Sequence, residues 1–544
     1  MRSDYFDLFK YGVSGELGLL SLPEKLEYIR LLMDLVMVEG PLAVVFANAL
    51  TTEKALGEND AAINAYSYCV TRAHQTMPTN ADLLALVGRM HPNPDLAVRL
   101  EILKKLSLTG EQAAASARSI DLKAILKNTP AHIGAAVAQL QADFKNFADP
   151  DEWLPLFKCP GRLAGMWRNE LFLHYARRGL WQKALPLWEQ MEDAMRSPYT
   201  RVYAADMHGL AGDMEQALAL YHAALRMDPE LHPVRRRIAE LESPRPLRPE
   251  LLRERRTALC VYSWNKGGML EQTLRALAKT DTGDNPVFVL LNGCTDDSRQ
   301  RVENVRPLFP DRQFTIVELP INIGAPAARN WLINLPDVRA CDYVAFMDDD
   351  VVMPKDWLIQ YLAAMESDPQ NAVVGCKVVF PPEGDEAPVM QYFYRSVSLA
   401  LEGALKLSIA VPMDGIRDTG LYSFTRSCLN VMGCLHLLRC SALRDVGDFD
   451  IRFSPSQVDD LDHDLCTCLR GYKVMYCGTV TCEHHQDSGV GVGRTRLSHA
   501  ALGSIWGNDL KLNYKHIDKL GTLKSLAAQT AAESALLRAK TERA

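Results

Sequence analysis

Three adjacent carboxylates, Asp348, Asp349 and Asp350, stand between an apolar run and a proline in the stretch YVAFMDDDVVMP. Ionised carboxylates at this spacing repel one another, and the repulsion is strongest where burial removes water. A positive charge is therefore expected nearby, supplied either by Arg or Lys beside a helix cap or by a divalent metal ion. Taken alone, such a triplet is more often a solvated turn or a helix N-cap.

Short β-rich runs alternate with amphipathic helices after Thr257. These strands and helices are the elements that must position the triplet. The strand and helix pairs are TALCVYSW with GMLEQTLRALAK, PVFVLL with DSRQRVENVRPLF, QFTIVEL with APAARNWLINL, and YVAFM with PKDWLIQYLAAM. The pattern predicts a mostly parallel, Rossmann-like sheet with helices on both faces. Ligands bind beyond the carboxyl ends of such strands. The loops SWNKGG, NGCTDD, PINIGA and DDDVVMP are therefore expected to meet at one crevice.

The residues in these loops suit a nucleotide. An aromatic face at Trp264 can stack on a base, and the amide of Asn265 can bond the base edge or the ribose. Asn292 and Asp296 lie in a small polar loop that allows close approach to a ligand. Arg329, at the start of a helix, could reach a phosphate. A pyrophosphate would be repelled by the carboxylate triplet unless Mg²⁺ or Mn²⁺ lay between them.

Residues 257 to about 490 resemble a family 2 glycosyltransferase with the GT-A fold. The resemblance runs in order through VYSWNKGGMLEQTLRAL, LLNGCTDDSRQRV, NIGAPAARN, YVAFMDDDVVMPKDWL, LRDVGDFDIRF and DDLDHDLCTCLRGYKVMYCG. It implies that Trp264 and Asn265 lie near the base. It also implies that Asp348 contacts the ribose or the metal, and that Asp350 is the metal ligand of a DxD motif.

The resemblance also assigns a catalytic base. In this family an acidic pair at the start of a helix, twelve residues before a Gly-Tyr, carries the base, and Asp459 stands twelve residues before Gly471. Asp460 then matches the base, and Asp459 replaces the usual Glu. A carboxylate within hydrogen-bond reach would take the proton of an acceptor hydroxyl, thiol or amide during attack on the anomeric carbon. The alternative is an acid-rich first turn stabilised by the helix dipole, which is the role expected for Asp462 and Asp464.

Two histidines and two arginines follow in TCEHHQDSGVGVGRTR. A histidine here resembles the late metal ligand or phosphate contact of GT-A enzymes, and His484 is a stronger candidate than His485. The glycine-rich run could let Arg494 and Arg496 close over the leaving pyrophosphate. A histidine pair at the surface is the alternative.

Two positions depart from the family pattern. Leu291 stands where an acid usually helps to recognise a uracil ring, so the identity of the base stays open. Cys466 stands where a basic residue is common on the helix after the base. Neither change removes the predicted metal ligands or the predicted base.

Residues 1 to about 245 are predicted to be helical, because apolar residues recur three and four apart. Three matched pairs of residues are each 33 residues apart: Gly179 and Gly212, Ala184 and Ala217, Trp188 and Tyr221. Tetratricopeptide repeats have a period of about 34 residues and could hold a peptide or another subunit on their concave face. A plain pair of helical hairpins is the alternative.

The predicted fold class is multidomain, with an all-α half, an α/β GT-A domain and a short helical tail. The expected divisions are helices over 1–150, repeats over 151–245, a linker over 246–256, the GT-A domain over 257–500 and a helical extension over 501–544. The linker ends an arginine- and proline-rich stretch between Arg235 and Arg256, whose composition is typical of an extended connection. A nucleic-acid patch is disfavoured because the stretch lacks interleaved aromatic residues.

The composition fits a globular protein of several domains. The chain has 544 residues, of which 48% are hydrophobic and 23% charged, and its net charge of -7 argues against a general nucleic-acid binder. The N-terminus lacks a signal pattern, and the longest apolar stretch is interrupted by Glu39, Gly40 and Pro41. We therefore expect a cytoplasmic protein without a transmembrane segment. The 13 cysteines, without a CxxC pair, are expected to be reduced thiols.

The favoured function is a metal-dependent inverting glycosyltransferase that uses a nucleotide diphosphate sugar; inversion follows from the resemblance. The donated sugar would be a hexose or an N-acetylhexosamine. A sugar-phosphate nucleotidyltransferase is an alternative, but it would carry a better glycine-rich basic loop than SWNKGG. A degenerate scaffold that acts through its repeats is the other alternative, and the DDD, DD and HH clusters argue against it.

The segment from Pro381 to Asn430, where GT-A enzymes vary with acceptor, carries no readable motif. Repeats joined to a transferase favour a protein acceptor or partner, with a cell-surface glycan as the other acceptor class.

Overall fold

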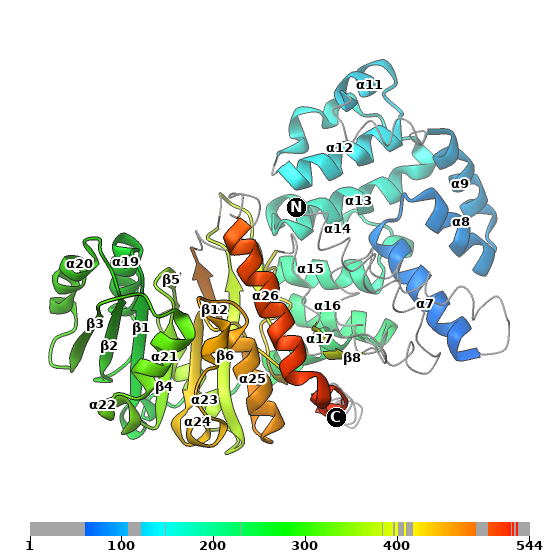
Figure 1. The fold of residues 1–544 in the computed structure, drawn as a ribbon. Helices are drawn as coiled ribbons and strands as arrows, with labels where there is room; N and C mark the ends of the chain where they lie inside the picture. The colour runs from blue at the N-terminus through cyan, green and yellow to red at the C-terminus, as the bar shows by residue number, and fades with distance from the viewer. Residues whose placement is uncertain are drawn as a thin grey trace.

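Helices fill the N-terminal half of the chain and a curled sheet fills the C-terminal half (Figure 1). The computed structural model describes residues 60–106, 121–146, 148–229, 231–382, 384–394, 398–400, 407–409, 417–485, 499–523, 525–526 and 529–530. Within these ranges no helix combines the length and the hydrophobicity that crossing a bilayer requires. All 13 cysteines lie in the same ranges as free thiols, as expected.

The N-terminal half consists of helices joined by short turns, which confirms the helical prediction for its described part. The helices are α7 (Asp60–Thr76), α8 (Ala81–Met90), α9 (Pro94–Leu106), α11 (Leu122–Asn128), α12 (Ile133–Asn146), α13 (Ala164–Arg177), α14 (Trp181–Glu189), α15 (Pro198–Leu210), α16 (Met214–Met227) and α17 (His232–Glu242). Short 3-10 turns are η2 (Pro150–Glu152), η3 (Leu154–Leu156), η4 (Gly161–Leu163) and η5 (Asp193–Met195). Side chains of Asn80, Asp121, Ser197 and Asp213 cap the N-termini of α8, α11, α15 and α16 by accepting hydrogen bonds from backbone N–H groups.

The two sequence repeats form two similar helix pairs, α13 with α14 and α15 with α16. Gly179 and Gly212 occupy the turns of the two pairs with φ of 75° and 87°, a backbone conformation that favours glycine. The matched alanines and aromatic residues are buried in both pairs. The sequence period therefore has a counterpart in packing, whereas membership of the tetratricopeptide family stays a prediction.

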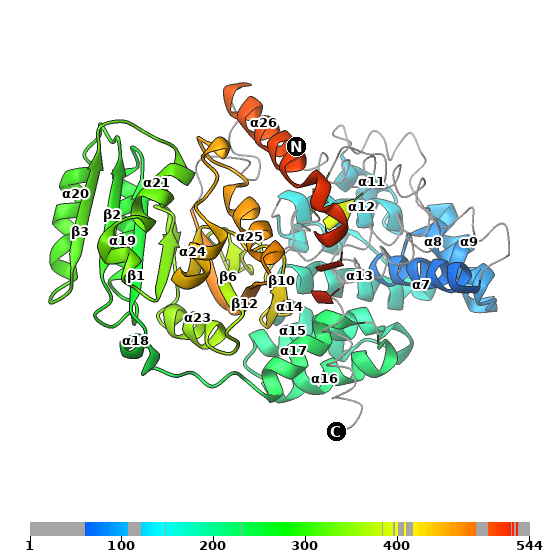
Figure 2. The same cartoon turned by 60° about the horizontal axis from the view of Figure 1, so that its bottom comes forward.

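The arginine-rich stretch is only partly extended. Helix α17 continues to Glu242, and within it Arg235 and Arg236 are 2% and 5% exposed. The prediction of an extended connection from Arg235 onward is therefore wrong for its first part, because burial in the helical half stabilises a helix there. Between α17 and α18 (Leu251–Glu254) the chain is a connection without helix or strand, as Figure 2 shows.

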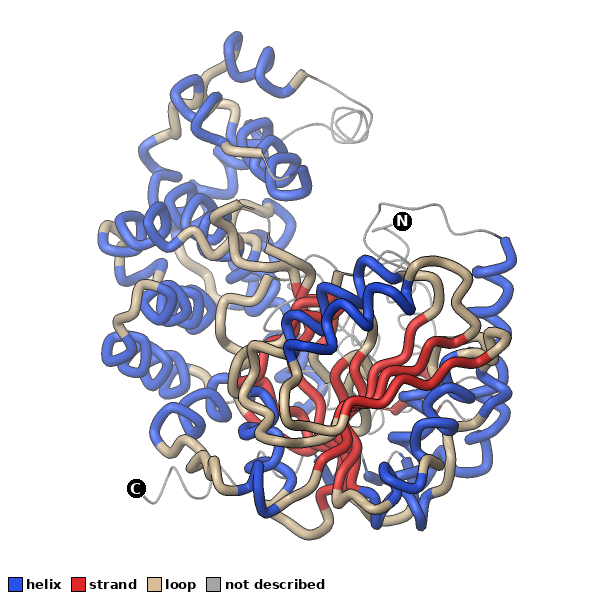
Figure 3. Tube along the Cα trace, turned by 90° about the vertical axis from the view of Figure 1, so that its left-hand side faces the viewer, coloured by secondary structure: helices blue, strands red, loops and turns tan. Residues whose placement is uncertain are grey.

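In the part of the C-terminal half that the structure describes, ten strands form one sheet, in the order β10-β12-β6-β11-β4-β1-β2-β3, with β5 paired to β12 and β7 to β6. The strands are β1 (Thr257–Ser263), β2 (Val287–Asn292), β3 (Phe314–Leu319), β4 (Tyr343–Met347), β5 (Val351–Val352), β6 (Asn371–Val379), β7 (Met390–Tyr392), β10 (Thr425–Cys428), β11 (Leu435–Arg439) and β12 (Lys473–His484). A separate hairpin joins β8 (Ser398–Ala400) to β9 (Leu407–Ile409). Figure 3 shows the strands gathered in one curled sheet with helices on both sides.

Helices cover the sheet, and the four predicted strand and helix pairs are confirmed. These helices are α19 (Gly267–Leu277), α20 (Ser298–Val305), α21 (Ala325–Ile333), α22 (Pro336–Arg339), α23 (Trp357–Met365), α24 (Cys440–Val446) and α25 (Asp459–Leu469). The last helix, α26 (His499–His516), is joined to α25 by contacts of Lys515 and His516 with Asp462. Further 3-10 turns are η6 (Arg306–Leu308), η7 (Ile451–Phe453) and η8 (Ile517–Lys519). Strands β2 and β4 are buried along their whole length, as parallel strands covered on both faces should be.

The prediction of a mostly parallel sheet is wrong beyond β4. Strands β1, β2, β3 and β4 pair in parallel, and so do β6 and β12. Strand β11, however, lies antiparallel between β4 and β6, and β5, β7 and β10 also pair antiparallel with their neighbours. Antiparallel strands need no helical crossover. The alternation of strands and helices on which the prediction rests stops after α23, so no pattern in the sequence indicates the direction of the later strands.

The helical half packs against the sheet half. One continuous hydrophobic cluster includes Trp188 and Tyr221 of the helices together with Phe393 and Tyr394 next to β7. Polar contacts join the same surfaces: Ala387 donates a backbone hydrogen bond to the carbonyl of Arg178 at 2.9 Å. The helical half is therefore not a freely tethered module.

A buried ion cluster closes this junction, with Glu386 between Arg178 and Arg417. We expect Glu386→Gln to lower the free energy of unfolding by about 3 to 5 kcal/mol, because it removes the carboxylate charge that pairs with two buried guanidinium groups. Urea unfolding would measure the loss. The matched control is Glu318→Gln, whose partner Arg299 is 47% exposed, and it should cost no more than about 1 kcal/mol. Equal losses in the two variants would contradict the assignment.

Candidate active site

The carboxylate triplet lies directly after β4 at the edge of the sheet where β1 and β2 also end. Asp349 and Asp350 are 7% and 5% exposed, whereas the side chain of Asp348 is 28% exposed. The N–H of Asp348 donates to the carbonyl of Cys434 at 2.9 Å, which fixes the triplet to the start of β11. The charges are thus largely removed from water, as the sequence argument assumed.

Two basic side chains supply part of the expected positive charge. The Nζ of Lys266 lies 2.8 Å from Asp350 Oδ2 and 3.3 Å from Asp349 Oδ1. On the other side, Arg329 Nη2 lies 3.8 Å from Asp348 Oδ1. Basic side chains and a metal ion can therefore both neutralise the triplet, because Lys266 contacts only one oxygen of Asp350 and Arg329 only one oxygen of Asp348.

The pKa values of the three carboxyl groups shift in different directions, and burial raises that of Asp348 above its usual range. Burial raises the pKa of Asp349 to about 6, against the opposing charge of Lys266, and Ser263 Oγ donates to its Oδ2 at 2.6 Å. Burial would also raise the pKa of Asp350, but contacts with His484 and Lys266 hold it below its usual range. Asp350 is therefore the member of the triplet that stays ionised most firmly.

Asp348, Asp350 and His484 form a set of donors that fits a divalent cation. Their ligand atoms all lie within 4.8 Å of one another. Asp350 Oδ1 is buried without a hydrogen-bond partner, and it lies 3.0 Å from His484 Nε2. Carboxylate oxygens with one imidazole nitrogen suit Mn²⁺, and water or phosphate oxygens can complete the coordination of Mn²⁺ or Mg²⁺.

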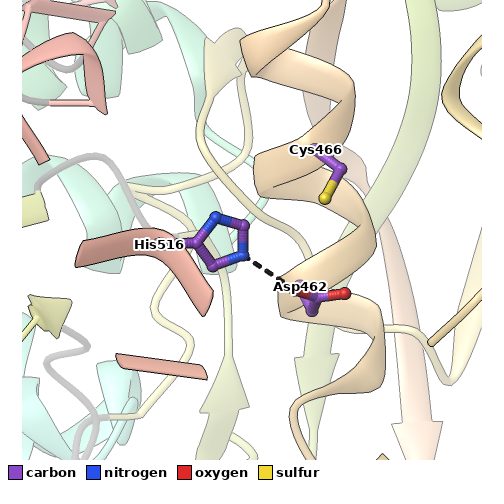
Figure 4. Close-up of side chains that lie close together, drawn as sticks. All are labelled: Asp462, Cys466 and His516. Atoms are coloured by element: carbon purple, nitrogen blue, oxygen red, sulfur yellow. Dashed lines mark hydrogen bonds and ion pairs between the residues drawn. The ribbon is translucent and has the colours of Figure 1, made fainter. Parts of the chain in front are cut away.

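A second group of donors, Asp462, Cys466 and His516, lies between α25 and α26 (Figure 4). Both carboxylate oxygens of Asp462 already have partners, since His516 Nε2 lies 2.7 Å from Oδ1 and Lys515 Nζ lies 2.6 Å from Oδ2. An ammonium group in contact with this carboxylate disfavours a bound cation there. We assign this group a structural role, because its contacts join α25 to α26.

Helix α25 presents the acidic pair of the predicted base motif. Asp460 is the second residue of the helix and is partly exposed, and its Oδ2 accepts a hydrogen bond from the N–H of Gly433 at 2.9 Å. A Cβ at Gly433 would lie 2.9 Å from the Cβ of Asp460 and 3.0 Å from Arg329 Nη2. Glycine is therefore required for this close approach between the start of β11 and α25.

Arg329 connects the two acidic motifs. It is 4% exposed; its Nη1 donates to Asp459 Oδ2, and its Nη2 donates to the carbonyl of Gly433 at 3.3 Å. The guanidinium also lies over the rings of Tyr262 and Phe449, both at 5.3 Å. The structure thus gives Arg329 a carboxylate partner, and its predicted contact with a phosphate stays a prediction.

Trp264 and Asn265 follow β1 on the open side of the site. Trp264 is 53% exposed, so about half of the residue is accessible to a ligand. Asn265 has a φ of 53°, and its Oδ1 accepts from the N–H of Thr295 at 2.7 Å. This bond joins the first loop to the second, and the base contact of either residue stays a prediction.

Asn292 and Asp296 hold the loops around the site. Asn292 is 3% exposed and its Oδ1 accepts from the N–H of Ile323 at 3.0 Å. Asp296 accepts from the N–H groups of Gly267 at 3.0 Å and Ser298 at 3.2 Å, so it caps the first turns of α19 and α20. Their side chains serve the loop framework, and their predicted ligand contacts are left as predictions.

The two histidines differ in position. His484 ends β12 with its ring buried against Asp350, whereas the ring of His485 lies 3.7 Å from Glu483 near the surface. The N–H of His485 donates to the carbonyl of Asp350 at 2.8 Å. Arg494 and Arg496 lie outside the described residues.

Part of the sequence matches a known protein family. Residues 258–447 match the model of glycosyl transferase family 2. This family 2 region contains β1 to β4, the carboxylate triplet and Arg329, whereas Asp460 and His484 lie beyond its end. A comparison with curated proteins found no match to the sequence.

Several solved glycosyltransferase structures resemble the chain at low similarity. GalNAc-T7 with UDP, GalNAc and Mn²⁺ is 11% identical over 42% of this chain and 44% of its own, with a TM-score of 0.34. The mannosyltransferase PcManGT from Pyrobaculum calidifontis with GDP-Man and Mn²⁺ is 18% identical over 60% and 90%, with a TM-score of 0.33. Residues 1–349 of S. aureus TarS with UDP-GlcNAc are 16% identical over 51% and 71%, also with a TM-score of 0.33.

Several residues around the site of the family 2 region were not predicted from the sequence. They are Tyr262, Ser263, Lys266, Gln391 and Gly433. Lys266 offered a signal, because it is a basic residue in the loop after β1. The others carry no charge. Tyr262 and Ser263 lie in the stretch VYSWNKGGMLEQTLRAL, but their residue types do not indicate a contact with the triplet, so only the folded arrangement shows these contacts.

Proposed function

We propose that this protein is a metal-dependent inverting glycosyltransferase that moves a sugar from a nucleotide diphosphate sugar to an acceptor. The observation that supports it best is the cluster of Asp348, Asp350 and His484, which Arg329 connects to the acidic pair at the start of α25. The match of residues 258–447 to glycosyl transferase family 2 supports the same reaction class.

Donor binding would use the loops after β1, β2 and β4. Trp264 would stack on the base, with Asn265, Asn292 and Asp296 shaping the pocket around base and ribose. Asp348, Asp350 and His484 would hold Mn²⁺ or Mg²⁺. The bound ion would neutralise charge on the diphosphate oxygens as the sugar departs. Arg494 and Arg496 would close over the same diphosphate.

Transfer would proceed by a single in-line displacement. The carboxylate of Asp460 takes the proton of the acceptor while the acceptor atom forms its bond to the anomeric carbon and the bond from that carbon to the diphosphate oxygen breaks. The backbone N–H of Gly433 holds Asp460 Oδ2 in place. Asp459, paired with Arg329, would support the geometry of the pair.

The acceptor would be a protein or a glycan of the cell surface, in a cytoplasmic reaction. Acceptor recognition is proposed for the segment between Pro381 and Asn430, whose described residues Phe393 and Tyr394 belong to the hydrophobic cluster shared with the helical half. Because the two halves share a hydrophobic cluster, deletion of the first 245 residues would expose apolar surface of the sheet half. Substitutions on exposed helix faces are therefore the better test of acceptor recruitment.

A thermal-shift screen of UDP- and GDP-sugars with and without Mn²⁺ tests the donor assignment. A ligand at 100 times its dissociation constant should stabilise the native state by about 2.7 kcal/mol. We expect one nucleotide class to raise the melting temperature, and to do so only when Mn²⁺ is present. An equal response with EDTA would overturn the metal dependence, and no response to any nucleotide sugar would overturn the donor class.

A further inference from the structure

Gln391 occupies an irregular position in strand β7, beside the site. Strand β7 pairs with β6 through Val378 with Tyr392 and Val379 with Met390, so Gln391 is the extra residue between the two pairs. A β-bulge of this kind turns a side chain away from the regular alternation of a strand, and bulges are common next to active sites. The side chain it redirects here meets the site from the segment between Pro381 and Asn430.

The redirected side chain contacts His484. Gln391 Oε1 lies 2.9 Å from His484 Nδ1, and an amide oxygen can only accept a hydrogen bond. The Nδ1 atom therefore carries a proton, and Nε2, 3.0 Å from Asp350 Oδ1, is the ring nitrogen left to bind a metal ion. A proton on Nε2 would be shared with Asp350 in the metal-free protein, and a bound cation would take its place between the two atoms.

We propose that Gln391 is a positioning residue that fixes the tautomer and the orientation of His484 for metal binding. The inference rests on the proposed metal dependence. A histidine ligand whose second nitrogen donates to a fixed acceptor binds metal more tightly than one that is free to rotate or to change its tautomer.

The other two proposed ligands are held in the same way. Tyr262 donates to Asp348 Oδ1 at 2.9 Å, and Lys266 donates to Asp350 Oδ2 at 2.8 Å. These partners come from β1 and the loop after it, whereas Gln391 comes from the segment proposed to recognise the acceptor. The hydrogen bond between Gln391 and His484 therefore links the proposed metal site to the segment proposed to recognise the acceptor.

The chain just before strand β7 is anchored by two backbone hydrogen bonds. The N–H of Phe380 donates to the carbonyl of Val389 at 2.8 Å, and the N–H of Ala387 donates to the carbonyl of Arg178 in the helical half at 2.9 Å. The bulge thus sits on a fixed segment, and Gln391 reaches His484 from a defined position.

Direct measurement of Mn²⁺ binding to the full chain, without nucleotide, tests the role of Gln391. Gln391→Met keeps the length of the side chain and removes the acceptor, and we expect its Mn²⁺ dissociation constant to rise by about 10- to 100-fold. Gln391→Glu keeps an acceptor oxygen and should bind Mn²⁺ close to the wild-type level. The matched control is Gln360→Met, which removes a 2.6 Å hydrogen bond from Thr479 of the same strand β12 and should leave Mn²⁺ binding unchanged.

The outcomes separate this inference from the proposed function. Absence of Mn²⁺ binding in the wild-type protein would overturn the proposed metal dependence itself. Wild-type binding with equal affinity in Gln391→Met would overturn the positioning role alone. A loss in Gln391→Glu as large as that in Gln391→Met would overturn the role of the acceptor oxygen. Nitrogen-15 spectra of the histidine rings in the metal-free protein should show His484 protonated at Nδ1 in the wild type and no longer restricted to that tautomer in Gln391→Met.

Discussion

Replacing Asp350 with Asn should lower the rate of sugar transfer by about 10²- to 10³-fold, the effect of losing several kcal/mol of charge stabilisation by a metal ion. Asn has the shape of Asp but no charge. It would weaken the ligand set with Asp348 and His484 and would leave Lys266 without its closest counter-charge. Single-turnover transfer at saturating donor, with Mn²⁺ affinity measured in parallel, would test this expectation.

The neighbouring acid provides the matched control. Asp349 contacts Ser263 and Lys266 rather than His484, so Asp349→Asn should retain Mn²⁺ binding and lose far less activity. If both variants lose activity equally while both still bind Mn²⁺, the metal role of Asp350 is excluded.

Asp460→Asn should lower transfer by about 10²- to 10⁴-fold, the contribution of a general base. The amide oxygen can still accept from the N–H of Gly433, so the start of α25 should keep its position. Donor affinity should therefore stay at the wild-type value while transfer falls. Thermal shift with donor and Mn²⁺, together with single-turnover transfer, would separate the two effects.

Asp460→Glu keeps a carboxylate and should retain more activity than the amide. The surface acid Asp445, exposed on α24, provides a further control, and Asp445→Asn should be silent. Transfer by Asp460→Asn within tenfold of the wild-type rate would rule out Asp460 as the base and would move the assignment to another acid.

The early strands could be predicted because their sequence shows both a hydrophobic pattern and the polar residues that mark strand ends. Strand β1 and β4 are apolar runs that end at polar loops, and the helices after them have amphipathic spacing. The carboxylate triplet was placed correctly at a strand end for the same reason. Strand β11 was not predicted to lie between β4 and β6, because strand direction depends on partners distant in the chain.

The site was predictable where a charged residue stands in a loop, and less so where a contact comes from the backbone or from an amide. Asp350 and His484 were named from the sequence, and the structure brings their side chains to 3.0 Å. Gln391 could not be named, because a bulge in β7, which single-residue patterns do not encode, brings it to His484. Arg329 was expected at a ligand, yet the structure buries it between Asp459 and Asp348.

The start of β11 determines the spacing between the two acidic motifs through main-chain atoms. The N–H of Gly433 holds Asp460, and the carbonyl of the next residue, Cys434, receives the N–H of Asp348. Side-chain substitutions elsewhere cannot change this spacing without moving the strand. Directed evolution toward larger or smaller acceptors should therefore accumulate its changes between Pro381 and Asn430, and it should leave Gly433 untouched.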